Sequence, residues 1–466
     1  MTLAKAEGET NVWKVLKAAF KDGSLGTKFS FFAMGAGYFS HRQYAKGLFT
    51  VLLQTLFTLY MAFGGGRALV SLFSGNLGTR LAGEIWNEEL QIYEKVRGDN
   101  SFLVLLYGVA SLVIVAVYLY VWYENVKGSY LSDLRLREGK SLLSGREEFF
   151  NLINRRFHVL LLALPLLGLL IFTVLPLVFM VLIAFTSYDY AHMPPGKLFD
   201  WVGLANFKAL FSLSGGTSSF ALVFLRVLVW TLVWAFLATF SNYFIGMLLA
   251  LAIQRKGIRG KAVFRTAFVL AIAVPQFVSL LLMQKVLDGD GILNKILGTN
   301  LLWLADQRHF SLLPRVMILL VNIWVGMPYT LLMATGILQN VPSDYFEAAK
   351  IDGAGPVKAF AHVVLPYMLQ ITTPYLITQF VTNINNFNVI WLLTGGGPVD
   401  NLYYGGGTQA QSTDLLVTWL YRLTTDKSPR YNVAAVIGII IFAISAAASL
   451  LVYGRSSSVR SEEDFQ

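Results

Sequence analysis

Long apolar segments alternate with shorter polar ones along this chain of 466 residues. Because a helix needs about 20 mostly apolar residues to cross the hydrocarbon core of a bilayer, the pattern predicts an all-α polytopic membrane protein with about eight transmembrane helices. The predicted spans are residues 47–66, 102–122, 159–185, 227–253, 264–285, 314–337, 367–392 and 432–453. Before the first span, residues 11–20 and 29–47 are short or interrupted by glycine and charge, which favours interfacial or re-entrant helices.

Lysine and arginine gather in alternate loops, which predicts an orientation. The segment before the first span and the loop after the second hold seven basic residues each, and the loop after the fourth holds four. The loop at 186–218 holds only Lys197 and Lys208. The positive-inside rule therefore places the basic loops, both termini and the segment 342–366 in the cytoplasm.

The segment 342–366 is a polar interruption between two spans. Asp344 stands near the start of a predicted helix, where the helix dipole favours an anion. Gly353 and Gly355 permit a sharp turn, and a second short helix leads to Leu365-Pro366. A helix–turn–helix at this place suits contact with a partner outside the membrane, and the alternative is a connector that rests on the lipid surface.

Polar side chains also occur inside two predicted spans. Gln379, Thr382, Asn383 and Asn386 follow the spacing i, i+3, i+4 and i+7, so on one helix they share a face. Two interpretations stay open: hydrogen bonds between helices, or a polar stripe in a cavity, where amides both donate and accept as sugar hydroxyls require.

Span 314–337 contributes further candidates for a cavity. Gly326 lets a ligand approach the backbone, and the flat ring of Tyr329 suits stacking on a sugar. For Trp324, ordinary packing or a place in the interfacial aromatic belt is the favoured interpretation.

Composition narrows the function classes. Hydrophobic residues make up 55% of the chain and charged residues 14%, far below the quarter that is common in soluble proteins. The net charge of +10 is spread over several loops, which disfavours a nucleic-acid partner. The chain has no cysteine, no phosphate-binding loop motif and no hydrolase motif, and its five histidines are scattered, so we expect no metal site and no catalytic residue.

Two sets of motifs carry a resemblance to a known family. Glu347-Ala348-Ala349, followed by Gly353 and Leu365-Pro366, resembles the cytoplasmic coupling loop of ABC importer permeases. The sequences NINNFNVIWLLTGGGP at 383–398 and TDLLVTWLYR at 413–422 resemble the larger permease subunit of maltose and maltodextrin ABC importers. The resemblance covers roughly Val159 to Tyr453, and it implies a six-helix permease core at 158–453, an N-terminal region at 1–157 with interfacial helices and two spans, and a cytoplasmic tail at 454–466.

The resemblance also implies two groups of functional residues. Sugar binding is implied for Val325, Gly326, Tyr329, Gln379, Thr382, Asn383 and Asn386. Coupling to an ATPase is implied for Glu347, Ala348, Ala349, Asp352 and Gly353, with the Glu347 carboxylate paired to a basic residue of the ATPase. Thr382 stands where the family pattern has a phenylalanine, and Gln379 where it has a serine, which leaves the sugar and its chain length open.

The family resemblance implies a transport subunit that is not an enzyme and binds no cofactor, while ATP and Mg²⁺ are bound by partner ATPase subunits. Implied partners are a second permease subunit, an ATPase homodimer, an extracellular sugar-binding protein and membrane lipid, in a bacterial or archaeal cell membrane. The short loop 186–218 implies that the binding protein docks on the outer loops alone and is tethered to the membrane.

Two alternatives remain at this point. One is a permease for another oligosaccharide or for glycerol phosphate, although a phosphate favours arginine or lysine in the cavity and none is among the cavity candidates. The other is a membrane-embedded glycosyltransferase, for which only Asp344 and Asp352 are acidic residues near a span.

Overall fold

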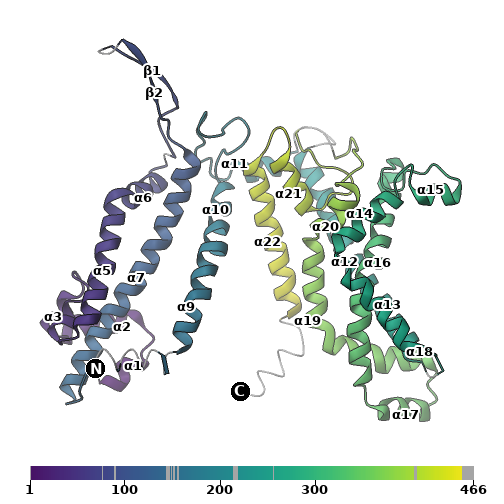
Figure 1. Cartoon of the computed structure of the whole chain (residues 1–466), viewed down its shortest axis with the longest axis horizontal. Coiled ribbons are helices and arrows are strands. Elements are labelled where there is room, and N and C mark those ends of the chain that lie inside the picture. The colour runs from purple at the N-terminus through teal and green to yellow at the C-terminus, as the bar shows by residue number, and fades with distance from the viewer. Residues whose placement is uncertain are drawn as a thin grey trace. The chain divides into compact units, whose positions relative to one another are not determined.

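The computed structural model describes residues 2–75, 77–88, 91–142, 157–213, 219–255, 257–403 and 407–453, together with residues 147, 150, 153 and 154. Contacts divide the chain into two compact units, Met1–Gly203 and Leu204–Gln466. The prediction of an all-α polytopic protein is confirmed, and Figure 1 shows long helices in both units.

Short helices precede the spans in the N-terminal unit. They are α1 (Leu3–Gly8), α2 (Val12–Asp22), α3 (Leu25–Phe29) and α4 (Ala36–Ser40). Helix α5 (Tyr44–Tyr60) continues through a π-helical turn (Met61–Gly65) into α6 (Gly66–Phe73), and α7 runs from Ser101 to Arg137. The last long segment of the unit is α9 (Phe157–Leu169), a second π-helical turn (Leu170–Val174) and α10 (Leu175–Ile183).

The short helices pack against the C-terminal part of α7. Ala6 and Ala19 join Val126 and Tyr130 in one buried apolar cluster. Asp133 of α7 lies inside the same region, 97% buried, and its carboxylate accepts from the Thr27 hydroxyl at 2.6 Å and faces the His41 Nε2 atom at 2.6 Å. The N-terminal segment is therefore a folded cap on α7 with a polar core, where the sequence suggested only interfacial helices.

A β-hairpin connects α6 to α7. Strands β1 (Gly83–Asn87) and β2 (Ile92–Val96) pair antiparallel, with Trp86 opposite Tyr93. Figure 1 shows the hairpin projecting beyond the helix ends. No strand was expected in this segment, because two short strands give too weak a pattern beside the apolar spans.

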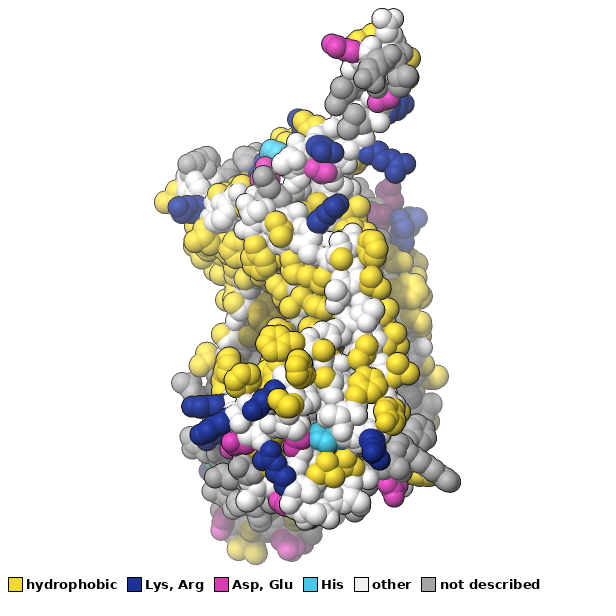
Figure 2. Space-filling view, turned by 90° about the vertical axis from the view of Figure 1, so that its left-hand side faces the viewer, with side chains coloured by type: hydrophobic (Ala, Val, Ile, Leu, Met, Phe, Trp, Pro, Cys, Tyr) yellow, Lys and Arg dark blue, Asp and Glu magenta, His cyan; other side chains and the backbone are white. Residues whose placement is uncertain are grey.

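Exposed apolar side chains cover the flanks of the spans. Figure 2, which views the chain from the side of the N-terminal unit, shows a broad apolar band with Lys and Arg side chains gathered below it and along its upper edge. Leu56 of α5 and Leu119 of α7 are each more than half exposed. Apolar area of this extent is stable in contact with lipid, with basic groups at the edges.

The second unit is built on two long helices. After α11 (Ala205–Leu210), helix α12 (Phe220–Gln254) packs along α16 (Leu312–Gln339). Gly246 permits their close approach, since a Cβ there would lie 2.8 Å from the Thr330 Cβ atom and 3.0 Å from the Leu331 amide nitrogen. Small residues at such crossings are typical of helices that associate in membranes.

The remaining helices of the second unit surround this pair. They are α13 (Lys261–Ala273), α14 (Gln276–Val286), α15 (Ile292–Leu297), α17 (Ser343–Ile351), α18 (Pro356–Ala359), α19 (Leu365–Ile384), α20 (Phe387–Thr394), α21 (Leu416–Thr425) and α22 (Tyr431–Tyr453). A 3₁₀ turn (Arg308–Ser311) precedes α16, and a π-helical turn (Phe360–Val364) joins α18 to α19.

Two of the eight predicted spans are broken helices. Among the described residues, six helices are long and apolar enough to cross a membrane, and the bent pair α13–α14 would be a seventh span. These two helices meet at 92° at Val274-Pro275, where the residue before proline is extended. The predicted segment 367–392 divides into α19 and α20 at Asn385-Asn386, because the Asn386 side chain accepts from the Val389 amide and starts a new helix.

Candidate functional site

A polar cavity of about 200 Å³ lies inside the second unit, between α12, α16 and α19. It is lined by Ala238, Thr239, Asn242, Gly326, Tyr329, Thr330, Tyr375, Gln379 and Asn383. None of these residues is Asp, Glu, Lys, Arg or His. The cavity therefore offers hydroxyl and amide groups and aromatic faces without a formal charge, which suits a neutral polar ligand.

Gly326 makes room for an amide in this cavity. A Cβ at this position would lie 2.4 Å from the Asn242 Nδ2 atom and 3.0 Å from its Cγ atom. The Asn242 side chain of α12 therefore occupies the space beside the α16 backbone. Its Oδ1 atom is buried and has no hydrogen-bond partner among the described residues, so this side chain keeps an unused acceptor.

A chain of hydrogen bonds holds the asparagines of the site. Asn386 Nδ2 donates to Asn383 Oδ1 at 3.2 Å, and Asn383 Nδ2 donates to the Thr239 hydroxyl at 2.9 Å. Asn383 is only 6% exposed. Both interpretations left open by the sequence therefore apply to Asn383, because it joins α19 to α12 and also lines the cavity.

Two tyrosine rings form the aromatic part of the cavity. Tyr329 of α16 and Tyr375 of α19 lie with their ring centroids 6.0 Å apart and their planes inclined by 24°. The Tyr375 hydroxyl is 3.3 Å from the Thr330 hydroxyl. Tyr329 is 56% exposed, so a large part of its ring is open to a ligand or to another subunit.

Four of the seven residues implied for sugar binding line the cavity: Gly326, Tyr329, Gln379 and Asn383. The other three do not. Val325 packs against the apolar core of the unit, and Thr382 is exposed, with its hydroxyl donating to the Thr378 carbonyl at 2.8 Å. Asn386 leaves the predicted helical stripe because it caps α20.

The residues that sequence reasoning missed come mainly from α12. Thr239 and Asn242 are polar residues within the apolar run 227–253, and this interruption was a usable signal. Ala238, Thr330 and Tyr375 gave no comparable signal, because each is ordinary in a packed helix. Within the described residues, no group of three or more metal-ligating side chains lies close enough to hold an ion.

The predicted helix–turn–helix is present at the end of the unit reached by the C-terminus of α16. Helices α17 and α18 are separated by Gly353, whose φ of +73° lies in the left-handed region that favours glycine. Glu347 and Ala348 of α17 and Asp352 at its end are exposed, and Ala349 is half-buried. The loop also exposes Ile351 (85%) and Val357 (79%), which leaves apolar area without a partner inside the chain.

The chain is similar in sequence to a known family of membrane transport proteins. Residues 242–459 match the family described as binding-protein-dependent transport system inner membrane component. The chain is 32% identical to the maltodextrin transport system permease protein MalC of Streptococcus pneumoniae, over 90% of this chain and 93% of that protein. It is 33% identical to the galactooligosaccharides transport system permease protein GanP of Bacillus subtilis, over 92% of this chain and 96% of that protein.

A further relative is the maltose/maltodextrin transport system permease protein MalF of Escherichia coli, 35% identical over 53% of this chain and 48% of that protein. The chain therefore belongs to the family of permease subunits of binding-protein-dependent ABC importers. It is a multi-pass membrane protein and a non-catalytic transport subunit, as the motifs predicted.

Proposed function

We propose that this chain forms one side of the path by which a neutral oligosaccharide, of the maltose and maltodextrin class, crosses a bacterial or archaeal cell membrane. The observation that carries the proposal is the uncharged polar cavity between α12, α16 and α19. Its amides and hydroxyls match the donors and acceptors of a sugar, and its two tyrosine rings suit the apolar faces of sugar rings.

The size of the cavity supports a second permease subunit as partner. A pocket that buries a small ligand usually has a volume of about 300–1,000 Å³, and this chain alone provides about 200 Å³. Tyr329 of the cavity wall is exposed, and so is Thr382 on α19, the helix that carries Gln379 and Asn383. A second subunit facing these residues would complete the cavity, and the pathway would then lie between two subunits.

Sugar uptake tests the cavity directly. The double variant Asn383→Ala with Asn386→Ala removes the linked amides, whereas Asn385→Ala removes an adjacent exposed amide whose side chain donates to the Val381 carbonyl. In proteoliposomes that contain the assembled transporter, we expect uptake of labelled maltotriose to fall about tenfold or more in the double variant. Equal uptake by the double variant and the control would reject the cavity as the sugar site.

The sugar class needs its own comparison. The maltodextrin relative MalC and the galactooligosaccharide relative GanP are nearly equally similar to this chain, at 32% and 33% identity. We favour maltodextrins because of the motif TDLLVTWLYR at 413–422, which resembles the maltose branch. Competition of unlabelled maltotriose and of a galactosyl trisaccharide against labelled maltotriose uptake decides between them, and stronger competition by the galactosyl sugar would reject the preference.

We further propose that the loop 342–366 couples the permease to an ATPase dimer that binds ATP and Mg²⁺. The loop is suited to docking because it exposes the apolar side chains of Ile351 and Val357 as well as the Glu347 carboxylate. Glu347→Ala should abolish sugar-stimulated ATP hydrolysis by the assembled transporter while leaving sugar binding by the external protein intact. Asp290→Ala, which removes an exposed carboxylate outside this loop, is the control, and normal hydrolysis in Glu347→Ala would contradict the role.

The orientation follows from the coupling role. The termini and the loop 342–366 are proposed to face the cytoplasm, and the outer loops to receive a sugar-binding protein tethered to the membrane. Because the chain has no cysteine, single cysteines introduced at Lys350 and at Asp290 report the sides of the membrane. A membrane-impermeant maleimide applied to intact cells should label position 290 and not position 350, and the reverse result would overturn the orientation.

A further inference from the structure

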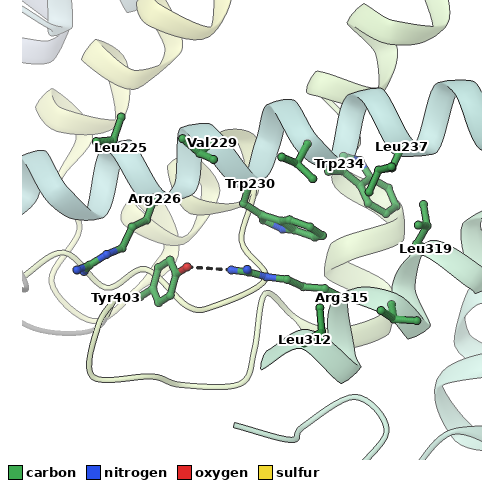
Figure 3. Close-up of a pocket in the computed structure, with 12 residues that line it drawn as sticks. Leu225, Arg226, Val229, Trp230, Trp234, Leu237, Leu312, Arg315, Leu319 and Tyr403 are labelled. Carbon is green, nitrogen blue, oxygen red and sulfur yellow. Dashed lines mark hydrogen bonds between the residues drawn. The ribbon is translucent and has the colours of Figure 1, made fainter. Parts of the chain in front are cut away.

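A second cavity of the same unit is open along the flank of α12 and α16, near the end of α16 that lies away from the loop 342–366. Its volume is about 560 Å³. The wall consists mostly of apolar side chains, and Leu225 and Val229 are each about half exposed, at 53% and 51%. Figure 3 shows the apolar side chains of α12 facing Tyr403 and Arg315, with the Arg315 guanidinium below the Trp230 ring and directed toward Tyr403. We call this cavity the flank groove.

No acidic residue in the described part of the chain neutralises the charge of Arg315. Its guanidinium donates to the Tyr403 hydroxyl at 2.8 Å and to the Ser412 carbonyl at 2.7 Å, and it lies 4.5 Å from the Trp230 ring centroid. All of these partners are neutral. The Nε atom is buried without a hydrogen-bond partner, and no acidic side chain among the described residues lies within ion-pair distance of Arg315. A partly desolvated cation of this kind favours an anion beside it.

The length of the flank groove indicates the kind of molecule that fills it. Its residues on α12 run from Leu225 to Leu237, which spans about 18 Å at about 1.5 Å per residue. Half of a hydrocarbon core of about 30 Å is about 15 Å. The groove therefore extends across one leaflet, which matches a lipid tail and is too short for a helix that crosses the whole membrane.

The charged end of the groove lies at the level expected for a lipid head group. Arg315 is near the first turn of α16, and its partners Tyr403 and Ser412 belong to the loop segment between α20 and α21. Trp230, next to Arg315, donates from its ring nitrogen to the Thr413 carbonyl. Tryptophan and arginine at the end of a span mark the membrane interface.

We propose that the flank groove binds one anionic phospholipid, with an acyl chain along α12 and the head-group phosphate against Arg315 and Arg226. A phosphate would lie against the Arg315 guanidinium and neutralise its charge, while the tail covers the exposed leucine and valine side chains. The lipid would thereby stabilise the contact between α12, α16 and the loop that carries Tyr403. This proposal does not depend on which sugar the protein transports.

Photo-crosslinking in the assembled transporter tests the occupant. A benzophenone amino acid at Val233, which lines the flank groove, is activated in membranes that contain phosphatidylglycerol and phosphatidylcholine. We expect the chain to gain the mass of one phosphatidylglycerol molecule. The same probe at Leu248, an exposed residue of α12 outside the groove, is the control. A crosslink from position 233 to another protein subunit, or a phosphatidylglycerol yield no higher than at position 248, would overturn the proposal.

The amount of lipid retained by the purified protein then tests whether Arg315 binds the head group. After detergent purification, Arg315→Gln should retain about tenfold less phosphatidylglycerol per chain, as expected for loss of a charge-assisted hydrogen bond. Because Arg315 also holds the loop at Tyr403, a second variant, Val229→Trp, fills the groove and leaves both arginines in place. Val229→Trp should also lose the lipid and Leu248→Trp should not. Unchanged retention in Val229→Trp, or equal retention of phosphatidylcholine, would reject an anionic lipid site.

Discussion

A single methyl group on α16 should separate the role of the cavity from the stability of the helix. Gly326→Ala places a Cβ atom 2.4 Å from the Asn242 Nδ2 atom, whereas Gly336→Ala, on the same helix, meets nothing within 4 Å. Alanine is favoured over glycine in a helix by about 1 kcal/mol, and this gain applies to both variants. At Gly326 the overlap costs about 1–3 kcal/mol, so the net change in unfolding free energy should lie between about zero and a loss of 2 kcal/mol.

The effect of Gly326→Ala on transport should exceed its effect on stability. The methyl group forces the Asn242 amide to turn, and this amide lines the cavity. A change of one methyl-sized group in a ligand pocket alters recognition by about tenfold or more. We therefore expect initial uptake of maltotriose in proteoliposomes to fall about tenfold in Gly326→Ala and to stay normal in Gly336→Ala, which should also unfold at a higher temperature in detergent.

The contradicting result is that Gly326→Ala transports sugar at the wild-type rate and gains the same thermal stability as Gly336→Ala. That result would mean that the close contact with Asn242 has no cost and that the cavity does not bind the transported sugar. A loss of transport together with a large loss of folded protein would instead assign the position to packing, so both the uptake rate and the unfolding temperature must be measured on each variant.

Three further predictions concern contacts inside one or the other of the two units. Asp414→Ala leaves the Arg422 guanidinium without the fully buried carboxylate that it contacts at 3.1 Å. The free energy of unfolding, measured with denaturant in detergent, should fall by about 3–5 kcal/mol. A fall of less than about 1 kcal/mol would contradict this. Gly246→Ala presses a methyl group on the α16 backbone and should lower stability by about 1–3 kcal/mol, seen as a lower unfolding temperature. The hydrogen bond to Asp133 raises the pKa of His41, so its contribution is complete below about pH 6.5 and is lost as the pH rises through the raised value. The thermal stability advantage of the native protein over His41→Gln should therefore shrink with rising pH, and a growing advantage would contradict the assignment.

Local sequence pattern was sufficient to predict several elements because each is decided by its own residues. Apolar runs of about 20 residues must become helices in a membrane, since every backbone polar group there has to be bonded within its own segment. In the same way, Gly353 between two short helical stretches determined the turn of the loop 342–366. The motifs around Glu347 and in residues 383–398 were sufficient to predict the family to which the chain belongs.

The composition of the cavity depended on the tertiary structure. Periodicity placed Thr382 and Asn386 on one stripe with Asn383, but Asn386 caps a new helix and Thr382 points to the exposed side. Thr239 and Asn242 belong to α12, far earlier in the chain than the lining residues of α16 and α19, and they join the site because α12 packs along α16. Such contacts depend on which faces of distant helices meet, and a helical repeat in one segment carries no information about its neighbour.

The flank groove is a product of tertiary structure for the same reason. In the sequence, Arg315 is an ordinary basic residue at the start of a span. Only the fold brings it to Tyr403, Ser412 and the Trp230 ring. No acidic partner lies within ion-pair distance of it among the described residues. Sequence by itself determined that this chain crosses the membrane as helices, because hydrophobic length and backbone bonding are local requirements. The packing of those helices decided where polar and charged groups are enclosed, because enclosure requires surfaces from several segments at once.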